Sequence, residues 1–259
     1  MVPNAMEPNQ AASQTALGTA YLRAAHQLLD AEPKLIDDPI AVALLGPDAS
    51  ARIQANVAAY RNPGAEAARA HVVLRSRFAE DRLAEAVDRG VTQYIPLGAG
   101  LDTFAFRQPR WALPLRILEV DHLQTHLLKR QLMDAADLPT PANVSYLSVD
   151  FERETLQQGL LRQEVTRHEP TFFSCPGDSI LLREPTIDAV LRLVAEFPSG
   201  SEIVLTFEQA PAAMEIKLRR AGFTGIDFLS PKEAEIRYFS QRPMDLPVPK
   251  RTAIVAAQV

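Results

Sequence analysis

The chain has 259 residues, which is enough for one large α/β domain or for two small domains. Hydrophobic residues make up 47% and charged residues 23% of the sequence, a composition that excludes disordered and fibrous proteins. The formal net charge of -5 lacks the basic surplus typical of nucleic-acid-binding proteins, so we expect no nucleic-acid partner.

The sequence contains one cysteine, Cys175, so no disulfide can form within the chain. Absence of disulfides is typical of a reducing compartment, and we expect a cytoplasmic protein. The first eight residues lack the basic start and apolar stretch of a signal peptide, and no apolar run is long enough to cross a membrane. We therefore expect no membrane partner.

The first 90 residues are rich in helical patterns. Apolar residues recur at helical spacing, and proline or glycine marks the ends of the pattern. The predicted helices cover 15–29, a short segment that begins at Pro39 and stops at Gly46-Pro47, and 65–89. We expect these helices to form an N-terminal cap, whose polar first 14 residues lie outside any helix.

After residue 90, short apolar runs alternate with helices, a pattern that predicts a largely parallel sheet covered on both faces. The predicted strands cover 94–97, 116–120, 144–149, 171–174, 202–207, 223–228 and 252–259. Helices are predicted at 123–136, 186–197 and 211–220. The last two strands are expected to pair antiparallel at one edge. We expect a single α/β domain, 1–259, with the core at 91–259 and the cap at 1–90.

Glycines or carboxylates follow the first three predicted strands, and parallel sheets bind ligands at this end. Gly98 and Gly100 follow the first strand, where glycine lets the backbone turn tightly and approach a ligand. Asp121 ends the second strand and suits ribose hydroxyls, while Asp150 ends the third and can meet an adenine amino group. Thr103 occupies the third glycine position of a dinucleotide-binding loop, which favours S-adenosylmethionine (SAM) over NAD. A plain strand-to-helix turn is the alternative interpretation of the glycines.

Three motifs surround the first two predicted strands: Leu97 to Thr103 (LGAGLDT), Phe106-Arg107 and Glu119-Val120-Asp121. They resemble the leucine carboxyl methyltransferase family, most closely its bacterial branch. The resemblance covers nearly the whole chain and extends to Thr15 to Gly18 with Arg23, Asp38-Pro39, Arg75 and Arg77, Lys129-Arg130, 200–204, and Arg237-Tyr238-Phe239 with Arg242. It implies the Rossmann-like fold of class I methyltransferases, with SAM as the cofactor.

The resemblance also implies roles for individual residues. Arg75, assisted by Arg23, holds the SAM carboxylate, which the forked guanidinium can pair with both oxygens. Asp121 binds the ribose, and Asp150 and Phe151 frame the adenine. The full cofactor-binding set is Arg23, Arg75, Gly98, Ala99, Gly100, Asp121, His122, Asp150 and Phe151, in which Gly98 contacts the methionine part.

The fourth strand and the segment after it depart from the family pattern. Cys175 replaces a tryptophan, Pro176 stands where an acidic residue usually contacts the SAM ammonium, and Leu181 replaces a tyrosine that faces the substrate. Asp178 can restore a carboxylate from two positions further on, and we predict Asp178 and Tyr238 as the catalytic pair. For Tyr238, a packed aromatic side chain is the alternative.

The family usually inserts a longer lid after the fifth strand. Here a single predicted helix, 211–220, takes its place. We therefore expect an acceptor pocket that is more open or differently covered.

The expected activity is SAM-dependent O-methyl transfer to a small molecule. A carboxylate acceptor is ionised at neutral pH and needs no general base, whereas a phenol or alcohol needs one. No His–Asp pair for such a base is evident near the fourth strand, which favours a carboxylate. Transfer to a hydroxyl and a SAM-binding protein that has lost catalysis are the alternatives.

His122 and His126 have a spacing that can bind zinc, but no third ligand is evident, so we predict no metal. A homodimer is compatible with the sequence, which determines neither the oligomeric state nor the acceptor.

Overall fold

The structure is a computed structural model that describes residues 8–175, 177 and 184–259. The helices before the first strand are α1 (Pro8–Leu29), α2 (Pro39–Leu44), α3 (Pro47–Ala55), α4 (Val57–Tyr60) and α5 (Pro63–Asp88). The expectation that the first 14 residues lie outside any helix is wrong for residues 8–14. Pro8 occupies the first helical position, and alanines continue the helix from there.

Helices α3 and α4 were not predicted. Gly46, with a φ of 84°, ends the α2 segment and is at the same time the N-cap of α3. Pro47 and the acidic Asp48 in the first turn are the local signals that start α3. A glycine–proline pair thus both stops one helix and starts the next.

The strands are β1 (Gln93–Pro96), β2 (Arg116–Asp121), β3 (Val144–Ser148), β4 (Thr171–Cys175), β5 (Glu202–Thr206), β6 (Gly225–Phe228) and β7 (Ile254–Gln258). They form one sheet in the order β3-β2-β1-β4-β5-β7-β6. The first five strands run parallel, and β7 is antiparallel to both β5 and β6. The predicted seven strands, the parallel core and the antiparallel pair at the edge are confirmed.

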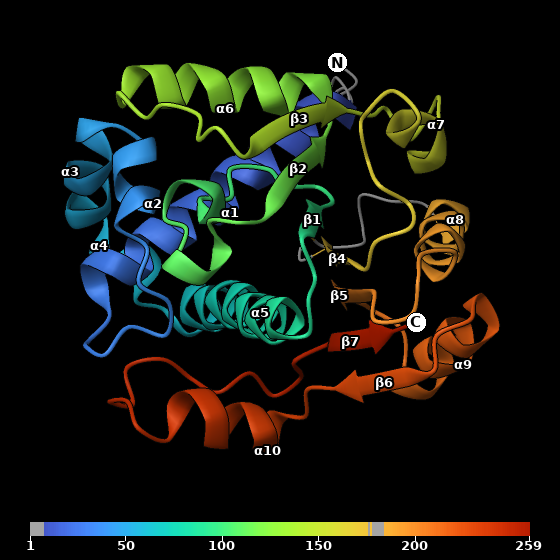
Figure 1. The fold of residues 1–259 in the computed structure, drawn as a ribbon. Helices are drawn as coiled ribbons and strands as arrows, with labels where there is room; N and C mark the ends of the chain where they lie inside the picture. Colours follow the sequence, from blue (N-terminus) through green and yellow to red (C-terminus); the bar gives the residue numbers. More distant parts are fainter. Residues whose placement is uncertain (1–7, 176, 178–183) are drawn as a thin grey trace, which may run out of the picture.

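The remaining helices are α6 (Leu123–Ala135), α7 (Leu156–Leu160), α8 (Glu184–Ala195), α9 (Pro211–Ala221) and α10 (Pro231–Ala234). The short helices α7 and α10 were not predicted. Helices α1 to α6 lie on one side of the sheet, and α7, α8 and α9 lie on the other (Figure 1). The sheet is therefore covered on both faces, as expected. In the described part of the chain, no helix combines the length and apolar character needed to cross a membrane.

Side chains alternate between two hydrophobic clusters along each central strand. Tyr94 and Phe172 face the cluster under α5, while their neighbours Ile95 and Phe173 face the cluster under α8. This period of two is the geometry of a pleated strand with both faces buried. Helix α5 belongs to the first cluster, so the last helix of the predicted cap packs directly on the sheet. The cap boundary at residue 90 stays a prediction.

A buried carboxylate fastens α5 to the amino ends of the strands. Glu202, at the start of β5, has an exposed fraction of 0%. Its oxygens accept hydrogen bonds from Arg82 Nε at 2.6 Å and from Arg89 Nη2 at 2.5 Å. The Gln258 amide of β7 donates a third hydrogen bond at 2.9 Å. This cluster lies at the amino ends of the strands, whereas the glycine loop that follows β1 lies at their carboxyl ends.

We expect Glu202→Gln to lower the free energy of unfolding by about 3 kcal/mol, because it leaves Arg82 without its buried counterion. Urea unfolding of both proteins measures the difference. Glu215→Gln is the control, since it breaks an exposed pair with Arg219 and should cost less than about 0.5 kcal/mol. Equal effects of the two substitutions would contradict a special role for Glu202.

Candidate cofactor site at the carboxyl ends of the strands

The strand order reverses between β1 and β4. Chain connections leave β1 in one direction and β4 in the other, and parallel sheets bind ligands beyond the carboxyl ends of the strands at such a reversal. The segments that meet there are the loop after β1, the end of β2, the end of β3 and the end of β4. The predicted glycines and carboxylates lie on these segments.

The loop after β1 folds back onto the end of β2. The N–H groups of Gly98 and Ala99 donate to the Val120 carbonyl at 2.8 and 3.2 Å, and Gly100 N–H donates to Asp121 Oδ2 at 2.6 Å. Both glycines have positive φ, 66° and 55°, a conformation that side chains disfavour. No heavy atom lies within 4 Å of where a Gly98 Cβ would be, so this part of the loop faces open space.

In the described part of the chain, two backbone N–H groups hold the Asp121 carboxylate. Its second oxygen, Oδ1, accepts the N–H of His122 at 2.6 Å. Each carboxylate oxygen has two acceptor positions, so each retains one for a ligand. A half-buried carboxylate fixed in this way fits a pair of ribose hydroxyl donors. His122 itself caps α6, with its ring nitrogen accepting the Gln124 N–H at 3.2 Å.

Three elements bring charge and a thiol together at this edge. Arg75, on α5, is 6% exposed, and Cys175 is the last residue of β4. Burial raises the pKa of the Cys175 thiol to about 11, against the lowering effect of Arg75 and with a further increase from Asp121. The thiol therefore lies within electrostatic range of both predicted cofactor residues. The predicted role of Arg75 in holding the carboxylate of the cofactor stays a prediction.

Behind the glycine loop lies a buried network of ions that joins the loop to the helical cap. Thr103 Oγ1 donates to Asp38 Oδ2 at 2.5 Å, and Asp38 also caps α2 by accepting the Ala41 N–H at 3.0 Å. Arg107 Nε lies 3.4 Å from Asp38 Oδ1 and 3.3 Å from Thr103 Oγ1. The guanidinium of Arg107 pairs with both oxygens of Glu80 on α5. We call Asp38, Glu80, Thr103 and Arg107, together with Arg23, the loop–cap network.

Arg23 lies in this network. Its Nη2 donates to the carbonyl of Leu101, and its Nε is 3.7 Å from Asp38 Oδ2 without a hydrogen-bond partner. Burial alone would raise the pKa of the adjacent Asp102, but Arg23, Arg107 and other cations lower it. Arg23 thus contacts the backbone of the loop, and its predicted assistance to Arg75 stays a prediction.

The rest of the predicted motif is explained by a second buried pair. Lys129 Nζ of α6 donates to Glu119 Oε2 at 2.6 Å, and both side chains are almost fully buried. The ammonium lies 5.4 Å from the centre of the Phe106 ring. These motif residues hold α6 against β2.

The predicted adenine side is formed by the end of β3. Asp150 accepts the Glu152 N–H at 3.0 Å, and Phe151 packs against the cluster under α8. One turn into α6, His126 is 5% exposed and its Nδ1 contacts Ser148 Oγ at 3.1 Å. Its Nε2 has no hydrogen-bond partner, and burial lowers the pKa of the imidazole to about 4.

The predicted catalytic residues are not both described. Asp178, Pro176 and Leu181 lie outside the described residues. Tyr238 is 8% exposed and packs in the cluster under α5, with Arg237 over its ring at 5.2 Å and Arg77 at 6.0 Å. Its packing matches the alternative of a packed aromatic side chain, and its catalytic role stays a prediction.

Arg242, another residue of the family resemblance, binds the segment between α1 and α2. Its guanidinium donates to the carbonyls of Pro33 and Ala31, which connect α1 to α2. The predicted single helix after β5 is confirmed as α9.

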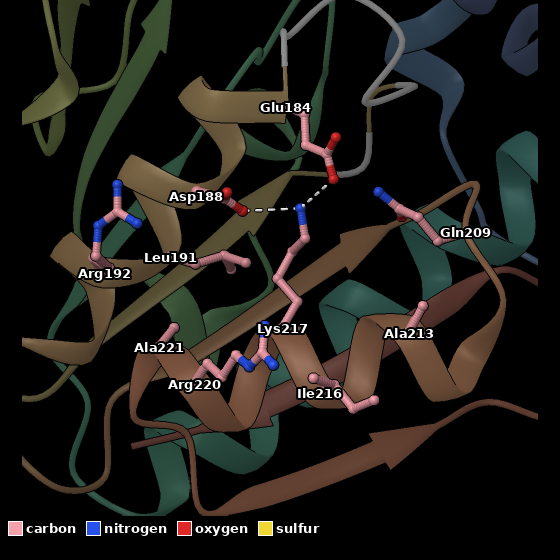
Figure 2. A pocket seen from close by; sticks show the side chains of 10 residues that line it. All are labelled: Glu184, Asp188, Leu191, Arg192, Gln209, Ala213, Ile216, Lys217, Arg220 and Ala221. Carbon is pink, nitrogen blue, oxygen red and sulfur yellow. Dashed lines mark hydrogen bonds and ion pairs between the residues drawn. The ribbon is translucent and has the colours of Figure 1, made fainter.

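A hollow of about 380 Å³ lies between α8 and α9, away from the glycine loop (Figure 2). Lys217 in its wall donates to Glu184 at 2.9 Å and lies 2.8 Å from Asp188, so its charge is neutralised within the protein. Neither the glycine loop nor the strand ends line this hollow, and we do not assign the cofactor to it. Within residues 8–175, 177 and 184–259, no cluster of three or more His, Cys, Asp or Glu suits a metal ion.

Comparison with known proteins agrees with the geometry of this edge. The family model for leucine carboxyl methyltransferase matches residues 16–195, more than two thirds of the chain. The chain belongs to the leucine carboxyl methyltransferase family. The match includes the cap, the glycine loop and the ends of β2, β3 and β4.

Individual relatives are similar over part of their length. YktD of Bacillus subtilis is 35% identical over 136 residues, which are 52% of this chain and 44% of YktD. A protein of Parafrankia is 30% identical over 203 residues, 74% of this chain and 62% of the relative. Both are named as inferred SAM-dependent methyltransferases, and this chain spans less than two thirds of either. A solved structure from Thermobifida fusca, named as an inferred methyltransferase, is 17% identical with a TM-score of 0.48, covering 83% of this chain and 91% of the other.

The reactivity of Cys175 reports on the assembly of this edge, because it is the only thiol of the chain. We expect Arg75→Met to slow its alkylation by iodoacetamide at pH 8, and Asp121→Asn to accelerate it. Removing the cation raises the thiol pKa, and removing the carboxylate lowers it. A change of one in this pKa changes the thiolate fraction about tenfold.

Arg75→Lys is the matched control, since it keeps the positive charge. Its alkylation rate should stay within about twofold of the unmodified protein, as expected for a retained charge. Unchanged rates in both Arg75→Met and Asp121→Asn would show that these groups do not lie near the thiol.

Proposed function

We propose that this chain binds SAM at the carboxyl ends of β1, β2 and β3 and transfers its methyl group to a small-molecule carboxylate. The observation that carries the proposal is the glycine loop, whose backbone closes on the Asp121 carboxylate while its Gly98 side faces open space. A carboxylate beside an open loop whose two glycines have positive φ fits a ribose and a methionine part.

The donor set at this edge fits SAM in charge as well as in shape. Arg75 pairs with the carboxylate of the methionine part, and Asp121 accepts hydrogen bonds from the ribose hydroxyls. Asp150 and Phe151 frame the adenine at the end of β3. The assignment of Gly98, Ala99, Gly100 and His122 to the same site is part of the proposal.

Bound SAM supplies a methyl group that its sulfonium already activates. The chain has to align the acceptor with that methyl group and exclude water. Cys175 lies at the carboxyl end of β4. It keeps its proton at neutral pH because burial raises its pKa, so it is a poor base. Burial lowers the pKa of the His126 imidazole to about 4, so its Nε2, which has no hydrogen-bond partner, is also a poor base. A carboxylate acceptor needs no base, and this supports carboxyl over hydroxyl transfer.

A rival function is SAM binding without catalysis. The single helix α9 in place of a longer lid and the departures at Pro176 and Leu181 favour it.

Asp178 and Tyr238 are the catalytic residues of the leading proposal. Burial raises the pKa of the Tyr238 phenol, so this group would donate a hydrogen bond rather than accept a proton.

Titration calorimetry tests the shared premise of both functions. We expect SAM and its demethylated product to bind, and Asp121→Ala to weaken both by about 100-fold, because a charged acceptor of ligand hydrogen bonds is lost. Asp188→Ala, in the α8–α9 hollow, removes a carboxylate elsewhere and should leave the affinity unchanged. Absence of SAM binding at millimolar concentration would overturn both functions.

A screen of carboxylic and phenolic acceptors with methyl-labelled SAM separates the two. We expect label transfer to carboxylic acids, with a rate that is flat from pH 6 to 9 because the acceptor is already ionised. A rate that rises with pH and acts only on phenols would replace carboxyl by hydroxyl transfer. Binding of SAM without turnover on any acceptor would favour the binding protein.

A further inference from the structure

The loop–cap network has no direct role in the proposed chemistry, yet it fixes the segment that would hold the cofactor. Resting on the proposed function, we propose that Asp38 is a positioning residue, through which docking of α1 and α2 and cofactor binding at the glycine loop stabilise one another. The link runs from Asp38 through Thr103 to Gly100.

The first part of the link is the contact between Asp38 and Thr103. Both residues have an exposed fraction of 0%, and their side chains are joined at 2.5 Å. The hydroxyl of Thr103 donates to a carboxylate, a charge-assisted bond that is stronger than a neutral one. Thr103 is three residues after Gly100, so the contact fixes the loop just beyond its glycines.

The second part joins the same carboxylate to the cap. Asp38 Oδ1 accepts the first-turn N–H of α2 at 3.0 Å, and the backbone N–H of Asp38 donates to Gln27 of α1 at 3.0 Å. Asp38 therefore fixes the start of α2 and the loop after β1 through its side chain, and the side of α1 through its backbone N–H. Displacement of the cap would leave a buried carboxylate without its partners, which is costly.

A separate contact connects α1 to the glycines. Arg23 donates to the Leu101 carbonyl, and a Cβ at Gly100 would lie 3.4 Å from the Ala16 Cβ. Helix α1 thus lies against the loop at its second glycine and at the residue that follows it. A loop held in this way keeps the Gly100 N–H directed at Asp121, which is the geometry that the ribose requires.

Thermodynamic linkage makes the effect reciprocal. If the cap holds the loop in the binding geometry, the cofactor must in turn stabilise the docked cap by the same free energy. A purely structural role predicts lower overall stability without this coupling. The two possibilities therefore differ in two measurable quantities, the SAM affinity and the hydrogen exchange of α2.

Thr103→Val tests the link, because it removes the hydroxyl and keeps the shape. We expect faster amide exchange in residues 39–44 of the free protein and SAM affinity weaker by about tenfold, the loss of one charge-assisted hydrogen bond. SAM should slow exchange in these residues in the unmodified protein and less so in the variant. Thr103→Ser keeps the hydroxyl and should restore both quantities.

Two further variants separate coupling from general destabilisation. Glu202→Gln weakens the fold at the opposite edge of the sheet and should leave SAM affinity within about twofold, because it shares no partner with the loop. Asp38→Asn combined with Thr103→Val should weaken SAM binding by less than the product of the single effects, since the first removes the charge and the second the hydroxyl of the same contact.

The outcomes distinguish this inference from the proposed function. SAM binding by the unmodified protein with unchanged affinity in Thr103→Val would overturn the coupling alone. Exchange in residues 39–44 that does not respond to SAM would also overturn it. Absence of SAM binding by the unmodified protein would overturn the proposed function, and the coupling with it.

Discussion

The fully buried carboxylate of Asp38 is the constraint on which the arrangement of the site depends. A charge without solvent must be paired and hydrogen-bonded, and Arg107, Thr103 and the first turn of α2 supply these partners. Meeting that demand brings the cap helices and the loop after β1 into one fixed geometry. The Gly100 N–H and the Asp121 carboxylate meet as a result.

Buried carboxylates have different roles at the amino ends and at the carboxyl ends of the strands. At the amino ends, Glu202 fastens α5 to β5 through Arg82 and Arg89, where no ligand is expected. At the carboxyl ends, the loop–cap network lies behind a loop whose outer side stays open. In both clusters, a buried carboxylate must keep its hydrogen-bonded and charged partners, and this fixes the elements that carry them. Only the second cluster lies beside the proposed ligand site.

The strands were predictable because a parallel strand buried on both faces must be a short continuous apolar run. All seven were predicted within two residues of their ends. Helices α3, α4, α7 and α10 were missed, because short helices are held by packing and capping rather than by a long apolar period. The start of α1 was misjudged for the same reason, since polar residues near a helix end give no periodic signal.

The sequence by itself determined which candidate site residue follows each strand: glycines after β1, Asp121 after β2, Asp150 after β3, and a cysteine at the end of β4. Side-chain partners were decided only by the tertiary structure. Thr103 and Asp38 are 65 residues apart, and Arg23 and Leu101 are 78 apart. Pairings over such distances depend on how the cap packs on the sheet, and no local pattern encodes them. The glycine loop was therefore predictable, while what holds it in place was not.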